Sequence, residues 1–397
     1  MHQFHHSANG LASMFRSAVP DVIRSRLQCC ASLCSVVGGA VTRIQSINTR
    51  FMRGKLFHVC LLCVGITISL YGCGDGGNRG ESALYAGVFE GVVEKSSGQS
   101  DPRPDIVVVV ADDMRWDLMS GEGHEWLNTP NFDQFVQSSA KMNNAFVPVA
   151  LCSPSRAAIL TGREPHLASA PGIAWRNNSF LKTQVTFVEA LQAAGYKTAY
   201  IGKWHLGDGA KPKAGFDHWE SFDWLGDFFD PVVYVNGERR EYRGYADDVL
   251  TARANLFMEA HKSSDQPVFL MVGLKAPHLK FEHPGRHANA FDDVTIPTPA
   301  TYDEDFSVSG KLQAVKDWLG MDNFHCSLKK CFDNSWDRYI KDHYKAILGL
   351  DDSIQTLRSS LVHRGKADNT LFMFTSDNGY SLGDHGLTEK HLSLIHI

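Results

Sequence analysis

Four short stretches of the chain are continuously apolar, and each ends in a group of polar side chains. They span residues 106–111, 198–201, 268–272 and 370–375. Their apolar residues do not alternate with polar ones, which is typical of strands buried on both faces of a parallel sheet. Helical stretches over residues 186–194, 246–261 and 339–361 separate the strands. The alternation of strand and helix predicts an α/β three-layer sandwich, with a large, mostly parallel sheet between helices.

The polar groups lie where the four strands end. In chain order they contain Asp112, Asp113, Lys203, His205, Lys275, His278, Asp377 and Asn378. Ligands of parallel α/β sheets bind at the carboxyl ends of the strands, so the four groups together predict a single site. Each group by itself is equally well explained as a helix N-cap or a turn, and only the coincidence of four indicates a function.

Three aspartates and one amide in these groups form a set of hard oxygen ligands. They are Asp112, Asp113, Asp377 and Asn378. Such a set suits Ca²⁺ or Mg²⁺, whereas zinc would favour histidine or cysteine. Because Ca²⁺ accepts irregular coordination by side chains, it is the predicted ion and Mg²⁺ is the alternative.

A motif around Cys152 predicts a loop that enters a helix. Residues 151–163 are LCSPSRAAILTGR, and a proline is tolerated in the first turn of a helix. A cysteine at a helix N-terminus can have a lowered pKa and be reactive. The alternative is a buried cysteine with a structural role.

The motif resembles the signature of the formylglycine-dependent sulfatases, the type I sulfatases of the alkaline phosphatase-like superfamily. The matching residues are Cys152, Pro154, Ser155, Arg156, Leu160, Thr161 and Gly162. The resemblance implies that a formylglycine-generating enzyme oxidises Cys152 to formylglycine, which attacks the sulfur of a sulfate ester as its hydrate. It extends over residues 102–392, which we interpret as the catalytic domain.

The same resemblance implies roles for the polar residues. The expected metal ligands are Asp112, Asp113, Cys152, Asp377 and Asn378, and the expected sulfate-binding residues are Lys203, His278 and Lys390. From their charges, we expect Arg156 to orient the hydrate and the two lysines to neutralise the sulfate oxygens. His278 would protonate the leaving alcohol, and His205 would accept a proton from the hydrate.

The expected substrate is a sulfated sugar or glycan, followed by an aryl or choline sulfate. Residues 215–219, 229–231 and 235–237 resemble sulfatases of the N-acetylglucosamine-6-sulfatase and heparan type. The nearby aromatic residues Trp219, Phe222, Trp224, Phe228 and Phe229 could pack on sugar rings or fill the core. The alternatives are a phosphonate monoester or phosphodiester hydrolase of the same superfamily, or a catalytically inactive sugar-binding homologue.

The first hundred residues predict export rather than a globular domain. A basic segment at 52–55 precedes an apolar run at 56–71 and then Cys73. The run is shorter than the ~20 residues of a spanning helix, so it resembles a secretory signal. We expect an extension and signal over 1–73, a flexible linker over 74–101, and a periplasmic or extracellular location. A lipid anchor at Cys73 is the expected membrane contact, with a cleaved signal or signal anchor as alternatives.

Composition adds few constraints. The 397 residues are 43% hydrophobic and 21% charged, as in ordinary globular proteins, and a net charge of −5 gives no support to nucleic-acid binding. Cys326 and Cys331 could form a small disulfide loop or remain thiols, and Asn177 begins a glycosylation sequon that matters only in a eukaryote.

The family resemblance ends shortly after Lys390. Sulfatases usually continue into a smaller C-terminal subdomain, so we expect that subdomain to be missing and residues 393–397 to be a non-native tail. Apolar surface should then be exposed on the core, which promotes aggregation and poor expression.

Overall fold

The computed structural model describes residues 101–303 and 332–390, except positions 102, 169, 171, 174–183, 333, 334 and 389. All of them belong to one compact unit, Gly80–Ile397. The predictions for the export signal, the linker, the sequon, Cys326, Cys331 and the tail lie outside the described residues. In the described part, helices are too short or too polar to cross a membrane.

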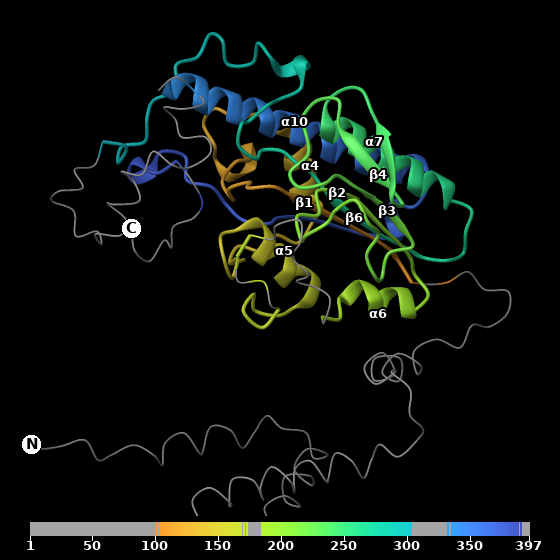
Figure 1. Cartoon of the computed structure of the whole chain (residues 1–397). Helices are drawn as coiled ribbons and strands as arrows, with labels where there is room; N and C mark the ends of the chain where they lie inside the picture. Colours follow the sequence, from red (N-terminus) through yellow and green to blue (C-terminus); the bar gives the residue numbers. More distant parts are fainter. Residues whose placement is uncertain are drawn as a thin grey trace, which may run out of the picture. The chain divides into compact units, whose positions relative to one another are not determined.

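The described strands form one seven-stranded sheet (Figure 1). Its members are β1 (Asp105–Ala111), β2 (Lys197–Gly202), β3 (His218–Ser221), β4 (Val232–Val235), β5 (Glu238–Glu241), β6 (Val268–Gly273) and β7 (Thr370–Ser376). Their order is β5-β4-β3-β2-β6-β1-β7. The five strands from β3 to β7 in this order are parallel, and β4 and β5 are antiparallel additions at one edge. The predicted mostly parallel sheet and its four strands are confirmed.

Helices cover both faces of the sheet, as predicted. In Figure 1, α4 (Pro130–Gln137), α7 (Ala246–Ala260) and α10 (Trp336–His363) lie on one face, and α5 (Cys152–Thr161) and α6 (Phe187–Ala193) lie on the other. Short 3₁₀ helices lie in the connections, at Ser120–Glu122, Gly285–His287, Ala367–Asn369 and Asp384–Gly386. Local signals explain where helices begin: Thr186 caps α6 in a reciprocal capping box with Glu189.

The two faces of β1 belong to two separate hydrophobic cores. Val107 and Val109 pack in the core beneath α4, α7 and α10, whereas Val108 and Val110 pack in the core beneath α5 and α6. Both sets must be apolar, which explains the continuous apolar run. The prediction that a strand is buried on both faces is wrong for β7, which lies at the edge of the sheet. Its residues Leu371 and Met373 are 49% and 40% exposed.

The carboxyl ends of β1, β2, β6 and β7 come together at one edge of the parallel sheet. Between β2 and β6 the approach is so close that a Cβ at Gly202 would lie 2.0 Å from the carbonyl oxygen of Gly273. The φ of Gly202 is +123°, which side chains rarely adopt. Glycine there allows the end of β2 to pass close to Gly273, the last residue of β6. Lys203 and His205 follow directly after it.

Candidate active site

Two buried aspartates, Asp112 and Asp113, follow β1. The backbone N–H of Asp112 donates to the carbonyl of Ala276 at 3.1 Å, and the N–H of Asp113 donates to Oδ1 of Asp377 at 3.0 Å. Asp113 has a φ of +74°, a left-handed conformation that aspartate tolerates better than most residues. The end of β1 is therefore bonded to the segments after β6 and β7.

Cys152 is the first residue of α5, after the extended N-cap residue Leu151. Arg156 lies four residues later, and side chains four apart lie on the same face of a helix. The Sγ atom of Cys152 is buried and accepts a hydrogen bond from Lys390 Nζ at 3.0 Å. Burial raises the pKa of the Cys152 thiol to about 11 despite the nearby lysines, so the lowered pKa expected for a helix N-terminus is wrong for the unmodified residue.

Each of the three buried carboxylates meets a buried cation. Lys203 Nζ donates to Asp112, and Lys390 Nζ donates to both oxygens of Asp113 at 2.6 and 2.5 Å. Arg156 Nε donates to Asp377 at 2.8 Å. Burial alone would raise the pKa of Asp112, but Lys203 and other cations hold it well below its usual range. For Asp377, burial outweighs Arg156 and raises the pKa to about 6.

Two oxygen atoms of this cluster are buried without a hydrogen-bond partner among the described residues. They are Asp112 Oδ1 and Asn378 Oδ1, and Asn378 uses its Nδ2 to donate to Asp113 at 2.7 Å. A buried acceptor without a partner costs about 1–3 kcal/mol. Ligand atoms of Asp112, Asp113, Cys152 and Asp377 lie within 4.8 Å of one another. The four predicted oxygen ligands therefore converge beside Cys152 and fit a hard divalent cation.

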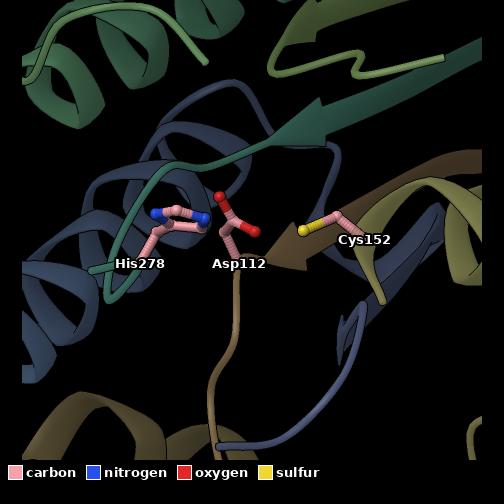
Figure 2. A group of neighbouring side chains, drawn as sticks. All are labelled: Asp112, Cys152 and His278. Atoms are coloured by element: carbon pink, nitrogen blue, oxygen red, sulfur yellow. The ribbon is translucent and has the colours of Figure 1, made fainter. Parts of the chain in front are cut away.

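His278 lies on the other side of Asp112 from Cys152 (Figure 2). Its ring comes from the segment after β6, and a nitrogen of the ring, the Asp112 carboxylate and the Cys152 sulfur lie within 4.8 Å of one another. Nδ1 donates to the carbonyl of Leu279 at 2.7 Å, and Nε2 lies 3.7 Å from Asp113 Oδ2. Burial lowers the pKa of His278 to about 3, so the ring is neutral before a ligand binds.

His205 is also buried, after β2. Neither ring nitrogen has a hydrogen-bond partner among the residues that the structure describes. The ring meets Trp224 edge-on, with centroids 4.9 Å apart. Burial and the charge of Lys203 hold the pKa of His205 well below its usual value. A neutral ring has one unprotonated nitrogen that can accept a proton, which the predicted role of His205 as a base requires.

The aromatic residues near His205 were expected either to fill the core or to pack on sugar rings, and the structure separates them by burial. Trp219, Phe222 and Phe228 are buried and belong to the interior of the protein. Phe229 is 45% exposed, and Trp224 is half-buried against His205. Packing on a sugar ring is therefore excluded for Trp219 and Phe222, which are fully buried, and stays open for Trp224 and Phe229.

One further residue near the site, Asp247, was not predicted. Asp247 lies in the first turn of α7 and accepts hydrogen bonds from the segment after β6. In that segment Lys275, a member of the predicted polar groups, donates from Nζ to the carbonyl of Leu225 at 2.8 Å. An acidic residue in the first turn of a helix is common, because it interacts favourably with the helix dipole. The sequence therefore contains no signal that separates Asp247 from a surface residue such as Asp248.

Comparisons with known proteins identify the family of the chain. The sulfatase family model matches residues 104–395. The chain is 29% identical over 350 residues to an N-acetylglucosamine-6-O-sulfatase of Bacteroides thetaiotaomicron, covering 72% of this chain and 60% of that protein. It is 28% identical over 303 residues to the human N-acetylglucosamine-6-sulfatase, covering 72% of this chain and 53% of the human protein. The chain thus spans about half to three fifths of the length of these relatives.

Solved structures share the fold. One, a protein in complex with its substrate D-glucosamine-2-N,6-O-disulfate, has a TM-score of 0.62 and 28% identity, covering 73% of this chain and 68% of that one. A second, a putative sulfatase of Bacteroides fragilis at 22% identity, has a TM-score of 0.58 and covers 74% of this chain and 66% of that one. The family match, the shared fold and the cluster around Cys152 lead to one conclusion: the chain belongs to the sulfatase family.

Proposed function

We propose that this protein hydrolyses sulfate esters of a sulfated sugar or glycan, using a formylglycine made from Cys152 and a bound Ca²⁺. The observation that carries the proposal is the pair of buried oxygens, on Asp112 and Asn378, that have no hydrogen-bond partner among the described residues. They lie in a cluster where two lysines and the Cys152 side chain also meet. A divalent cation would satisfy these oxygens, and a sulfate group would satisfy the lysines.

Two groups would supply chemistry that the unmodified chain lacks. Asp112, Asp113, Asp377 and Asn378 would hold the ion, which acts as a Lewis acid toward a sulfate oxygen. Mg²⁺ is the alternative, but it demands a nearly ideal octahedron, whereas Ca²⁺ accepts an irregular set of side chains. A formylglycine at position 152 would supply a nucleophile that can release sulfate again, in place of the neutral thiol that burial favours.

The cations of the site would bind and polarise the sulfate group. Lys203 and Lys390 are buried, and each already contacts a carboxylate of the cluster. In a buried site such preorganised charges stabilise developing negative charge more strongly than they would in water. Arg156 is bonded to Asp377 and to the carbonyl of Lys203, so it is held rigidly beside residue 152 and can orient the side chain there.

The two histidines would move protons. With Nδ1 donating to Leu279, His278 presents Nε2 toward the cluster. An anionic sulfate ester beside this ring would favour its protonated form, which could then protonate the leaving alcohol. Neither ring nitrogen of His205 has a hydrogen-bond partner in the described part of the chain, and the unprotonated one would accept the proton of the residue-152 side chain when sulfate is released.

The relatives support a sugar as the substrate. Two of them are named N-acetylglucosamine-6-sulfatases, and one solved structure holds a sulfated glucosamine. An exposed aromatic ring at Phe229 and the half-buried Trp224 provide surfaces on which a pyranose could pack.

Mass spectrometry and a substrate panel would test the proposal. The peptide that contains Cys152, isolated after expression with a formylglycine-generating enzyme, should show the mass of the aldehyde. The protein should then release sulfate from glucosamine 6-sulfate in the presence of Ca²⁺. Faster hydrolysis of a matched phosphodiester would instead identify a phosphodiesterase, and an unmodified cysteine with no turnover would indicate an inactive sugar-binding homologue.

Removing either sulfate-binding lysine should slow catalysis. Lys203→Ala and Lys390→Ala should each lower kcat/KM by about 2–4 kcal/mol of transition-state stabilisation, the effect of losing one preorganised donor. Steady-state kinetics with glucosamine 6-sulfate would measure the loss. Lys211→Ala is the matched control, because Lys211 is 79% exposed and forms a surface ion pair with Asp208. Parental kinetics in a Lys203 or Lys390 variant would exclude that lysine from sulfate binding.

We also propose that the protein is exported and anchored by a lipid at Cys73. The support is the basic and apolar pattern of residues 52–73. In a bacterial host, metabolic labelling with a fatty acid should mark the parent protein and not Cys73→Ser. Export with no label in either protein would instead indicate an ordinary cleaved signal.

A further inference from the structure

The side chain of Asp247 is fully buried and bound by two backbone amides. Its Oδ1 accepts a hydrogen bond from the N–H of Lys275 at 2.7 Å, and its Oδ2 accepts one from the N–H of Ala276 at 2.9 Å. Asp247 belongs to the first turn of α7, whereas Lys275 and Ala276 follow β6. The carboxylate therefore links a helix on one face of the sheet to the strand end that leads into the active site.

The linked segment carries His278. The N–H of His278 donates to the carbonyl of Lys275 at 3.0 Å, so the turn begins at the residue that Asp247 binds. Next to it, the carbonyl of Ala276 accepts the N–H of Asp112. The position of the His278 ring relative to Asp112 thus depends on where residues 275 and 276 are held.

A carboxylate is a costly choice for this contact. Burial raises the pKa of Asp247 to about 6, which reflects the penalty of placing a charge in the interior. Asparagine is almost the same size and avoids that penalty, but its amide has only one acceptor atom, and its NH₂ group would face an N–H donor. A carboxylate places a separate acceptor oxygen on each of the two adjacent backbone amides, which an asparagine in the same position cannot do, and this indicates that both contacts matter here.

We propose that Asp247 is a positioning residue for the proton transfer by His278, acting through the backbone of residues 275 and 276. This inference rests on the proposed function, because it assumes that His278 protonates the leaving alcohol. If Asp247 has this role, the loss of rate on changing it should depend on how strongly the leaving group needs a proton.

Two substrates separate this role from a structural one. Glucosamine 6-sulfate releases a poorly acidic sugar alcohol that needs protonation, whereas 4-nitrophenyl sulfate releases a stable phenolate that does not. Asp247→Asn should lower kcat for glucosamine 6-sulfate by about tenfold or more and leave kcat for 4-nitrophenyl sulfate within about threefold. KM should change little, because the hydrogen bonds of Asp247 go to the backbone of Lys275 and Ala276 and not to the side chain of Lys203 or Lys390. Asp248→Asn, which removes the neighbouring exposed acid paired with Arg286, should match the parent on both substrates.

A double-mutant comparison tests whether the effect passes through His278. If it does, Asp247→Asn combined with His278→Ala should be no slower on glucosamine 6-sulfate than His278→Ala alone. If the asparagine variant does not fold, Asp247→Ser serves instead, since the smaller side chain leaves room for water to reach the second amide. Kinetics are compared per folded protein, counted by circular dichroism.

Several outcomes would overturn the inference. They are parental kinetics in the folded Asp247 variant, an equal loss on both substrates, or losses that multiply in the double mutant. If the parent protein is active and any of these results is found, the role of Asp247 is refuted and the proposed function is not. A parent that releases sulfate from neither substrate refutes the proposed function, and this inference fails with it.

Discussion

Cys152→Ala is expected to abolish sulfate release while leaving the fold intact. The alanine side chain cannot be converted to an aldehyde, so no covalent nucleophile remains at the N-terminus of α5. Loss of a nucleophile that acts together with its neighbours typically costs on the order of 10⁴–10⁶-fold in kcat. The thiol is small, so the variant should still unfold cooperatively, which thermal denaturation would verify. Sulfate release from glucosamine 6-sulfate measures the loss.

A serine at the same position is the informative control. Cys152→Ser keeps a group that can attack sulfur but cannot expel sulfate again, so the variant should accumulate a sulfated serine visible by mass spectrometry. Turnover by Cys152→Ala at a rate comparable to the parent would show that residue 152 is not the nucleophile.

Removal of divalent metal is expected to have the second largest effect. Lewis-acid stabilisation of a sulfate oxygen contributes several kcal/mol, so chelation should lower kcat at least about 100-fold. The unpartnered oxygens of Asp112 and Asn378 should then raise the free energy of the folded state, so the melting temperature should fall as well. Added Ca²⁺ should restore both activity and melting temperature, and Mg²⁺ should restore less.

Variants of the ligands distinguish this site from unspecific metal binding. Asn378→Ala should weaken the dependence of the melting temperature on Ca²⁺, because it removes one of the two unpartnered oxygens. Asp230→Asn, a change at a half-exposed surface aspartate, should leave that dependence unchanged. Full activity in the chelated parent protein would refute the metal role.

The sequence was sufficient to predict four of the five parallel strands, all except β3. Strands such as β1 contribute to two cores, so their residues are apolar without alternation, and this pattern is visible without any structure. The antiparallel hairpin of β4 and β5 was missed, although its turn is Asn236-Gly237, a strong hairpin signal. The same residues had been interpreted as a motif for substrate type, and four-residue strands carry little periodicity of their own.

The convergence of the candidate site residues could also be predicted from the sequence. Strand ends in a parallel sheet share one edge, so polar groups that follow several buried strands must lie near one another. The motif around Cys152 then identified the family before any geometry was known. These inferences depend on local pattern and chain order, which the sequence contains directly.

Only the tertiary structure decided how those residues are paired. The contacts of Lys390 with Asp113, of Lys203 with Asp112 and of Arg156 with Asp377 join residues about 90 to 280 positions apart. The oxygens left unpartnered, the raised pKa of Cys152 and the two amides bound by Asp247 follow from such contacts. The physical reason is that burial and hydrogen bonding are properties of an environment assembled from distant segments, whereas residue type and periodicity belong to the chain itself.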